Sequence, residues 1–461
     1  MTNPSRSPRA GVSRGRWASP RRDRLRLPQE GDTLSELRSL LLALALPTLA
    51  LAFAISVLTT YGPVVLIHLA HSDTKVGLLI GGEGVFALCV PLLAGAASDR
   101  LPASRLGRRL PFVLLGTPFL AAGLVLLPFS PSYLLAALVV FAIYVGYFLY
   151  YPPYRALYAD LFPRSYYGRA QSSQALARGA GLGAALLAGG LLLTVWRPFP
   201  FALAAAVVLA ATLALLPVAR LASTVRAKAP DEGLPRLREL VRNRDLAAFA
   251  VANALWEFSF TGLRTFVVLY VVQGLGESAA VASGVIAVVA VAYVVAAPLA
   301  GWLGDRYGIV TVIRWSGLLY GVGLVCGVFP HSLAPMLPAL PVVALAGAVL
   351  MTLPQALGFS LAPAGSEGAV AGIQDFSRGL GVVLGPIVVG AAIDLFRGDL
   401  ASTSGYAAMW PTIGIPVLAG VAVVGLVGRP PDDAKSALGS APPACGTATP
   451  HEPTEWSGTL L

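Results

Sequence analysis

The sequence predicts an all-α membrane protein in which twelve transmembrane helices form two pseudo-symmetric six-helix bundles. Three observations support this fold class. Of the 461 residues, 56% are hydrophobic and only 12% are charged, and the mean hydropathy is +0.73. Apolar runs of about 20 residues, the length that crosses a bilayer, recur along the chain. A segment of the first half is also repeated in the second half.

Apolar runs of this length are expected to be helices. Hydrocarbon offers no partner for a free backbone N–H or C=O, so a spanning segment either satisfies its own groups as a helix or joins a closed barrel. Barrel strands alternate in polarity, and these runs do not. Bounded by Pro, Gly and charged residues, the runs predict helices at 38–68, 76–98, 111–129, 132–158, 171–195, 199–222, 246–272, 279–302, 310–329, 333–361, 367–394 and 406–428.

The distribution of basic residues predicts the orientation. An even number of helices places both termini on one side of the membrane. The connections on that side hold fifteen Lys and Arg residues, and the opposite connections hold only Lys75, Arg197 and Arg397. Because Lys and Arg are enriched in cytoplasmic loops, we expect a multi-pass protein of the inner (plasma) membrane with both termini in the cytoplasm.

The net charge of +10 does not indicate a nucleic-acid partner. Eight arginines lie between Arg6 and Arg26, and a second basic cluster covers 220–244, so both clusters adjoin membrane segments. Their expected partners are the anionic head groups of the lipid bilayer. The first apolar run begins too late and is too long for a signal peptide. The three cysteines predict neither a disulfide framework nor a metal site.

Five regions are expected along the chain. They are a basic, disordered cytoplasmic tail at 1–37, a first six-helix bundle at 38–222, a cytoplasmic linker at 223–244, a second bundle at 245–428 and a cytoplasmic tail at 429–461. Within the linker, leucines at helical spacing among arginines predict a short interfacial helix.

The two bundles contain an internal repeat. Residues 156–181 match residues 356–381 at an offset of 200 without a gap, with nine identities in 26 positions. The identities include Gln174 and Arg178, which recur as Gln374 and Arg378, so apolar bias does not explain the match. Such duplication predicts two related bundles with a solute path between them.

The connection after the second predicted helix carries a charged motif. It reads Gly-Ala-Ala-Ser-Asp-Arg at 95–100, ending in Asp99 and Arg100, and continues to Gly-Arg-Arg with Arg108 and Arg109. The connection after the eighth predicted helix reads Gly-Trp-Leu-Gly-Asp-Arg-Tyr-Gly at 301–308.

The charges of these two loops are candidate gating residues. The aspartates can accept hydrogen bonds from arginines or from a helix N-terminus at the cytoplasmic face, and such contacts can latch one conformation. In the second half the candidates are Asp305 and Arg306. The alternative is that the arginines are only topology signals.

The paired loops resemble the signature of the major facilitator superfamily. A second resemblance is narrower: the Arg-x-Gly-Arg-Arg-x-Pro loop at 105–111 and the Arg-Ala-Leu-Tyr-Ala-Asp-Leu segment at 155–161 are similar to phrases of the sucrose and proton symporter family and its animal relatives. That resemblance implies that Arg155 and Asp160 belong to the transport machinery. Leu110 departs from it, because the family usually has a basic residue there.

Charged residues inside membrane helices are costly and are therefore functional candidates. Arg155 has Gln355 as its counterpart in the repeat, and a substrate or coupling site need exist only once. For Asp160, helix capping remains an alternative to proton coupling.

A row of tyrosines follows the helix that carries Arg155. Tyr144, Tyr147, Tyr151, Tyr154 and Tyr158 recur at steps of three and four residues, which places them on one helix face. Such a wall suits sugars, because rings pack on apolar C–H faces while hydroxyl groups and Arg155 bind the polar rim. The candidate substrate contacts are Tyr147, Tyr151, Tyr154 and Arg155. Tyrosines at helix contacts or at the interface are the alternative.

Two glutamates are candidate proton carriers. Glu257 lies about 20 Å along its helix from Arg244, which places it near the middle of the bilayer. Desolvation there disfavours the charged carboxylate, which suits reversible protonation. A static ion pair with an arginine of a neighbouring helix is the alternative. Glu83 is a second candidate, and we expect Arg264 to be interfacial.

Arg178 and Arg378 begin the repeated Arg-Gly-x-Gly phrase, and we assign both to a shared scaffold or gate because both copies retain them. The sequence contains no P-loop, nucleophile elbow or metal-ligand cluster. We therefore expect a monomeric, non-enzymatic transporter without cofactor or metal. It would move a sugar or another polyhydroxylated solute with protons by alternating access. Export of amphipathic compounds and a non-transporting role in membrane assembly remain alternatives.

Overall fold

The computed structural model describes residues 34–100, 109–162, 167–222, 243–361 and 367–426. All regular elements in these ranges are helices. Those of the first half are α1 (Leu34–Ala70), α2 (Asp73–Arg100), α3 (Leu110–Leu126), α4 (Tyr133–Leu161), α5 (Tyr167–Val195) and α6 (Phe199–Ala222). Those of the second half are α8 (Arg244–Leu269), α9 (Ala279–Tyr307), α10 (Ile309–Cys326), α11 (Leu340–Ser360), α12 (Glu367–Leu395) and α13 (Met409–Val424).

Short helical turns join some of these helices. They are η1 (Leu127–Phe129) after α3, the π-helical turn η3 (Tyr270–Gly274) after α8, and η4 (Ala401–Thr403) and η5 (Tyr406–Ala408) before α13. Within the described ranges, eleven helices are long and apolar enough to cross a membrane, and α2, with 28 residues, is the remaining long helix. The predicted all-α fold class is confirmed. The predicted linker helix lies outside the described residues.

One helix starts later than the sequence predicts. We expected a helix over 333–361, but α11 begins at Leu340 and the preceding residues form turns. Pro335 and Pro338 explain the difference, because proline has no N–H to donate to a helix and clashes with the preceding turn. Pro341 is tolerated in the first turn of α11, where no N–H is needed.

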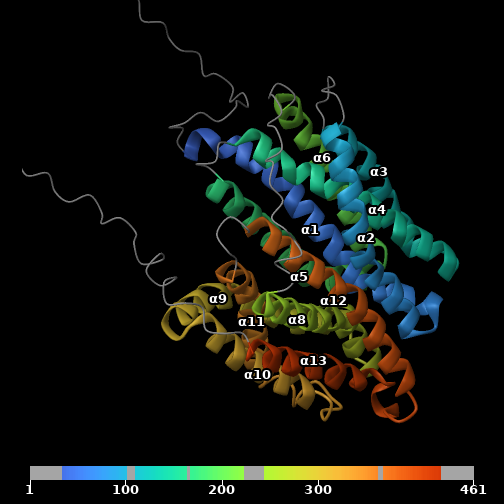
Figure 1. Cartoon of the computed structure of the whole chain (residues 1–461). Coiled ribbons are helices and arrows are strands. Elements are labelled where there is room, and N and C mark those ends of the chain that lie inside the picture. Colours follow the sequence, from blue (N-terminus) through green and yellow to red (C-terminus); the bar gives the residue numbers. More distant parts are fainter. Residues whose placement is uncertain (1–33, 101–108, 163–166, 223–242, 362–366, 427–461) are drawn as a thin grey trace, which may run out of the picture.

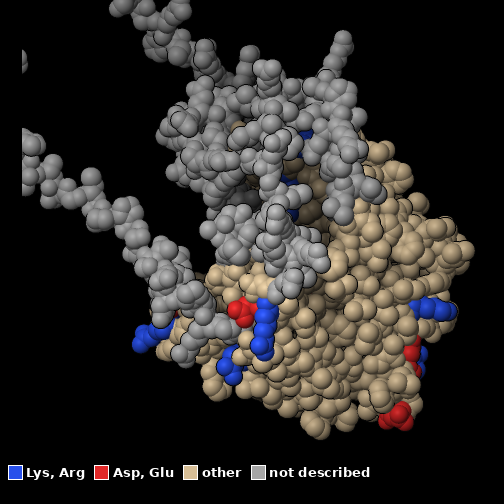
Figure 2. All heavy atoms as spheres, viewed as in Figure 1, with Lys and Arg blue, Asp and Glu red and all other residues tan. Residues whose placement is uncertain are grey.

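Small residues allow the helices of each half to pack closely. A Cβ on Gly116 of α3 would lie 2.5 Å from the carbonyl oxygen of Gly146 on α4, so only glycine permits this approach. Membrane helices associate through such close packing and not through the hydrophobic effect. On the face that Figure 2 shows, most charged side chains of the described residues lie at two opposite sides, with a wide uncharged belt between them. That belt is the surface a bilayer would cover.

The two halves meet along two helix pairs, α2 with α12 and α5 with α9, and α1 also contacts α8. In Figure 1 the first half lies above the second, and α12 runs along the boundary between them. A Cβ on Gly81 would lie 2.6 Å from the Val383 carbonyl oxygen, and one on Gly84 would lie 2.7 Å from the Gly379 carbonyl oxygen. The α2–α12 pair is therefore a tight seam from the predicted outer end toward the middle of the bundle.

Candidate functional site

Helix α8 carries two ion pairs near the middle of the bundle. Glu257 lies 3.6 Å from Arg378 of α12, measured from Oε1 to Nε. Arg264, two turns further along α8, donates from its NH2 group to Oε2 of Glu83 on α2 at 3.2 Å. The first pair lies within the second half, whereas the second pair joins the two halves. The ion-paired alternative for Glu257 is thus the arrangement in this structure, and Arg264, which we expected to be interfacial, pairs with Glu83 of the other half.

These pairs differ in their access to solvent. The side chain of Glu83 is 14% exposed and that of Arg264 is 30% exposed, while Arg378 is 53% exposed. An exposed guanidinium on a helix that packs against the other half indicates an open space beside it. With Glu257 at 25%, the Glu257–Arg378 pair is the more exposed of the two.

An aromatic wall on α4 lies close to these charges. The rings of Tyr147 and Tyr151 stack with their centroids 5.5 Å apart and an interplanar angle of 18°. Arg178 of α5 donates a hydrogen bond to the Tyr151 hydroxyl group. The guanidinium carbons of Arg155 and Arg178 lie 5.5 and 5.6 Å from the centroid of the Tyr151 ring, within the range of cation–π attraction.

The wall and the ion pairs form one site. Tyr147 lies within electrostatic range of Arg178 and Glu83 in its own half and of Arg378 in the other half. Arg178 also lies within electrostatic range of Arg378. We define the central site as Tyr147, Tyr151, Arg155, Arg178, Glu83, Glu257, Arg264 and Arg378. It combines flat aromatic surface with charged hydrogen-bonding groups.

Tyr154 is not part of this site. It is fully buried, and its hydroxyl group binds the Leu44 carbonyl oxygen and, at 2.7 Å, the Thr48 hydroxyl group on α1. Tyr158 donates to the same Leu44 carbonyl oxygen at 2.7 Å. The predicted substrate contact by Tyr154 is therefore wrong in this conformation, because α1 occupies its only polar group.

The predicted gating charges of the first half lie at the end of α2 and at the start of α3. Asp99 and Arg100 belong to the last turn of α2, and Arg108 lies outside the described residues. Arg109 is half-buried at the start of α3. Their side-chain roles, like that of Asp160 in the last turn of α4, stay predictions.

The second charged motif lies in the last turn of α9. Asp305 and Arg306 are exposed there, and the guanidinium of Arg306 lies over the rings of Trp302 and Tyr307 at 5.5 and 5.6 Å. These are contacts within one helix. A contact of this motif with the first half therefore stays a prediction.

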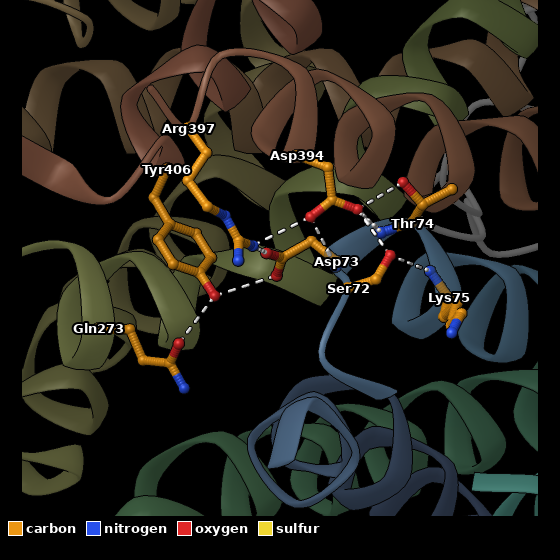
Figure 3. A network of polar contacts seen from close by, with 8 residues as sticks. All are labelled: Ser72, Asp73, Thr74, Lys75, Gln273, Asp394, Arg397 and Tyr406. Carbon is orange, nitrogen blue, oxygen red and sulfur yellow. Dashed lines mark hydrogen bonds and ion pairs between the residues drawn. The ribbon is translucent and has the colours of Figure 1, made fainter. Parts of the chain in front are cut away.

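A polar network at the predicted outer end joins the halves (Figure 3). Arg397, which follows α12, donates to Oδ2 of Asp73 at 2.5 Å and to Oδ1 of Asp394 at 3.0 Å. Asp73 is the first residue of α2 and is fully buried. The Tyr406 hydroxyl group donates to Oδ1 of Asp73 at 3.0 Å. Gln273 completes this side of the network, with its amide oxygen 3.0 Å from the same hydroxyl group.

Asp394 is held by the start of α2. Its carboxylate accepts hydrogen bonds from the hydroxyl groups of Ser72 and Thr74, both at 2.7 Å. It also accepts from the backbone N–H groups of Asp73 and Thr74 at 3.0 and 2.9 Å. A carboxylate at a helix N-terminus binds N–H groups that have no partner within the helix. We call Asp73, Asp394, Arg397 and Tyr406 the outer network.

The outer network is not among the sites that the sequence predicts, where Arg397 stands only as one of three basic residues on the outer side. A usable signal was present, since an Asp and an Arg three residues apart at the end of α12 face the same way, and another Asp opens α2.

A second contact closes the outer end between α5 and α9. The Tyr61 hydroxyl group of α1 donates to the Leu186 carbonyl oxygen at 2.7 Å and lies 3.1 Å from Oγ of Ser283. Ser283 of α9 accepts from the backbone N–H of Gly190 at 2.9 Å. Together with the outer network, this contact seals the predicted outer end of the central site.

The halves separate toward the predicted cytoplasmic end. A Cβ on Gly190 of α5 would meet Ser283, whereas a Cβ on Gly183, two turns further in, would meet no described atom within 4 Å. Arg178 and Arg378 are both exposed. In the part of the chain that the structure describes, the central site is therefore open toward the predicted cytoplasmic end. No described group of His, Cys, Asp and Glu side chains gathers as a metal site would require.

Comparisons with known proteins agree with this architecture. The family model of the Major Facilitator Superfamily matches residues 42–290 and 250–458. Among curated proteins, none matches the chain.

Several solved transporter structures are similar. A bacterial homolog of the human lysosomal transporter Spinster, inward-facing and occupied, has a TM-score of 0.70 at 16% identity, covering 87% of this chain and 98% of that one. The nucleoside transporter NupG has a TM-score of 0.68 at 16% identity, with 83% and 98% covered. The human organic anion transporter MFSD10 has a TM-score of 0.55 at 17% identity, with 84% and 99% covered. At these identities the similarity establishes the fold, and the family match covers nearly the whole chain. The chain belongs to the Major Facilitator Superfamily.

Proposed function

We propose that this protein is a secondary active transporter that moves a small solute, a sugar or another polyhydroxylated compound, by proton-coupled alternating access. The observation that carries the proposal is the central site itself. The stacked Tyr147 and Tyr151 rings and the Arg155 and Arg178 guanidiniums come from the first half, and the Glu257–Arg378 pair comes from the second half. A solute bound there contacts both halves, which is the condition for coupling its binding to their relative motion.

The geometry corresponds to one stage of such a cycle. The outer network and the Tyr61–Ser283 contact seal one end of the central site, while Arg178 and Arg378 are exposed at the other. Opening the outer end requires these contacts to break. On the cytoplasmic side we propose that Asp99, Arg100, Arg108, Arg109, Asp305 and Arg306 form the corresponding latch when the inner end closes.

Glu257 is the proposed proton carrier. A proton on its carboxylate removes the charge that holds Arg378, and the freed guanidinium can then bind a hydroxyl or anionic group of the solute. Glu83 is a second candidate, because protonation there releases Arg264 and loosens a link between the halves. Asp160 is a third candidate.

The placement of the protein follows the same proposal. We propose an inner-membrane monomer with both termini in the cytoplasm and with a solute, protons and lipid as its partners. The uncharged belt of Figure 2 supports the membrane location. The excess of Lys and Arg in the connections of one side supports the orientation.

The test is uptake into proteoliposomes with an inward proton gradient, using a panel of radiolabelled sugars and polyols. We expect accumulation that collapses with a protonophore and falls at least about tenfold in Arg155→Ala and Glu257→Gln. Asp399→Asn, an exposed acid after α12, is the matched control and retains uptake. Unchanged proton-driven uptake in both site variants would show that the assigned roles are wrong. Protection of cells against toxic amphipathic compounds, without uptake of any sugar, would indicate an exporter instead.

A further inference from the structure

The two repeated arginines of the central site have different electrostatic surroundings. Arg178 on α5 and Arg378 on α12 occupy the same place in the 200-residue repeat. Three residues after each arginine comes a glycine, Gly181 or Gly381, which packs against the first helix of its own half. This shared packing allows the neighbours of the two arginines to be compared position by position.

The two glycines identify the equivalent residues on α1 and α8. A Cβ on Gly381 would lie 2.8 Å from the Cβ of Glu257, and a Cβ on Gly181 would lie 3.1 Å from the Cβ of Ala52. Ala52 in the first half therefore stands where the second half has Glu257. The first half keeps the arginine of the repeat and has a methyl group in place of the carboxylate.

The missing carboxylate changes the contacts of Arg178. Arg378 pairs with Glu257 at 3.6 Å. Among the side chains that the structure describes, Arg178 pairs with no carboxylate and instead lies against Tyr151, to whose hydroxyl group it donates. Arg155 contacts the same ring, so two guanidiniums converge on one tyrosine. Arginines in such an arrangement bind carboxylate, sulfate or phosphate groups well, because the planar fork matches two of their oxygens.

We propose that the transported solute carries an anionic group that binds Arg178 and Arg155 beside Tyr151. This group completes in the first half the ion pair that Glu257 completes in the second half. The inference rests on the proposed transport function and narrows its substrate class to acidic sugars or comparable polyhydroxylated anions.

The anion also has a role in closing the inner end. Arg178 and Arg378 belong to opposite halves and lie within electrostatic range of each other, so their charges repel. An anion between them removes this repulsion and attracts both guanidiniums. Binding of the correct solute thereby favours approach of the halves at the open end, whereas a neutral analogue lacks this effect.

The first test compares solutes that share one ring and differ in charge. Binding of glucose, glucuronate, glucose 6-phosphate and glucosamine to the full chain in detergent is measured by calorimetry. We expect at least one of the two anions to bind about 10- to 100-fold more tightly than glucose, the range of one charge-assisted hydrogen-bonded contact. The carboxylate and phosphate probes separate the two anion types. Binding of glucose or glucosamine as tight as that of both anions would overturn the proposal.

Variants then locate the effect. Arg178→Gln removes the anion advantage, whereas Arg314→Gln, an exposed arginine of α10, retains it. An unchanged ratio of anion to glucose affinity in Arg178→Gln would also contradict the inference. If the wild-type protein transports glucose but binds the anions no more tightly than glucose, the proposed transport function stands and only the anionic substrate class fails. Absence of flux for every solute would remove both.

A second pair of variants tests the comparison of the halves at Ala52 itself. Ala52→Glu supplies Arg178 with the carboxylate that Arg378 already has, and Ala52→Gln is the control of equal size. We expect Ala52→Glu to abolish anion binding and Ala52→Gln to weaken it less than Ala52→Glu does. If both variants elute normally in gel filtration and bind the anion equally, the inference that Arg178 lacks a counter-ion is contradicted. If neither variant folds, the anion affinity of Arg178→Gln tests the inference instead.

Discussion

Arg397 donates a 2.5 Å hydrogen bond to the carboxylate of Asp73 and so joins the end of α12 to the beginning of α2. Asp73 is fully buried, whereas the Arg397 side chain is 46% exposed. A buried carboxylate is stable only when its oxygens are paired, and Arg397 and Tyr406 together pair both of them. The halves cannot part at this end without hydrating Asp73 and breaking these contacts.

Loss of Arg397 should weaken the outer seal. We expect Arg397→Ala to shift the equilibrium toward an outward-open form by about 1–2 kcal/mol, roughly 5–30-fold, because a buried charge loses its partner while the bond from Tyr406 remains. Spin labels at Pro131→Cys and Gly398→Cys, on exposed residues of the two halves, measure the outer distance. Asp73→Asn combined with Arg397→Ala should recover part of the seal. An unchanged distance distribution in Arg397→Ala would exclude a sealing role.

Acid should favour the sealed form. Asp73 lies before the predicted span 76–98, and burial raises its pKa from 3.8 to about 6. When the outer end opens, water reaches the carboxylate and its pKa returns toward the ordinary value. The sealed form therefore binds the proton more tightly, and its share grows as the pH falls from about 7.5 to about 5. The same two labels report this shift, and in Asp73→Asn the outer distance should no longer depend on pH in this range. Opening of the outer end in acid would contradict the assignment.

A side chain at Gly190 should separate the outer ends of α5 and α9. Gly190→Val places methyl groups where Ser283 and the Ala279 backbone lie, so we expect a shift away from the sealed form of about 1–3 kcal/mol. Gly183→Val is the matched control, because a Cβ there meets no described atom within 4 Å. Equal label distances in the two variants would show that this contact does not hold the outer end closed.

Tyr151 and Tyr154 should respond differently to the loss of a hydroxyl group. Tyr154→Phe leaves the Leu44 carbonyl oxygen with one fewer donor, so we expect a loss of stability of about 1 kcal/mol and unchanged solute affinity. Tyr151→Phe removes the acceptor of Arg178 and should weaken solute binding severalfold with little effect on melting. Thermal unfolding and binding titrations of both variants test this. If Tyr154→Phe weakens solute binding as much as Tyr151→Phe does, Tyr154 belongs to the solute site and its assignment to packing against α1 is contradicted.

The sequence was sufficient to predict the helices and several members of the central site. Apolar runs set the helices because bilayer thickness fixes their length, and the exceptions occur where prolines interrupt a run, as before Leu340. Tyr147, Tyr151 and Glu257 could be selected because polar groups in a spanning helix are rare. Their partners could not, because pairing depends on which helices touch.

Contacts between distant segments explain the errors. Tyr154 shares a helix face with Tyr151, yet it points to α1, where Pro47 interrupts the hydrogen-bond ladder close to the Leu44 carbonyl group. Arg264 finds Glu83 181 positions away, and Asp73 finds Arg397 324 positions away. Helix periodicity contains no information on such pairs, so only the assembled bundle shows them.

The central claim is that the two halves move about the central site, with one end closing as the other opens. Its most direct test measures two distances in the same protein, the outer one between labels at 131 and 398, and an inner one between Leu176→Cys and Tyr307→Cys on α5 and α9. In wild type we predict a short outer and a long inner distance, and in Arg397→Ala a population with a long outer and a short inner distance. Outer opening without inner closure, or no change at either end, would contradict alternating access.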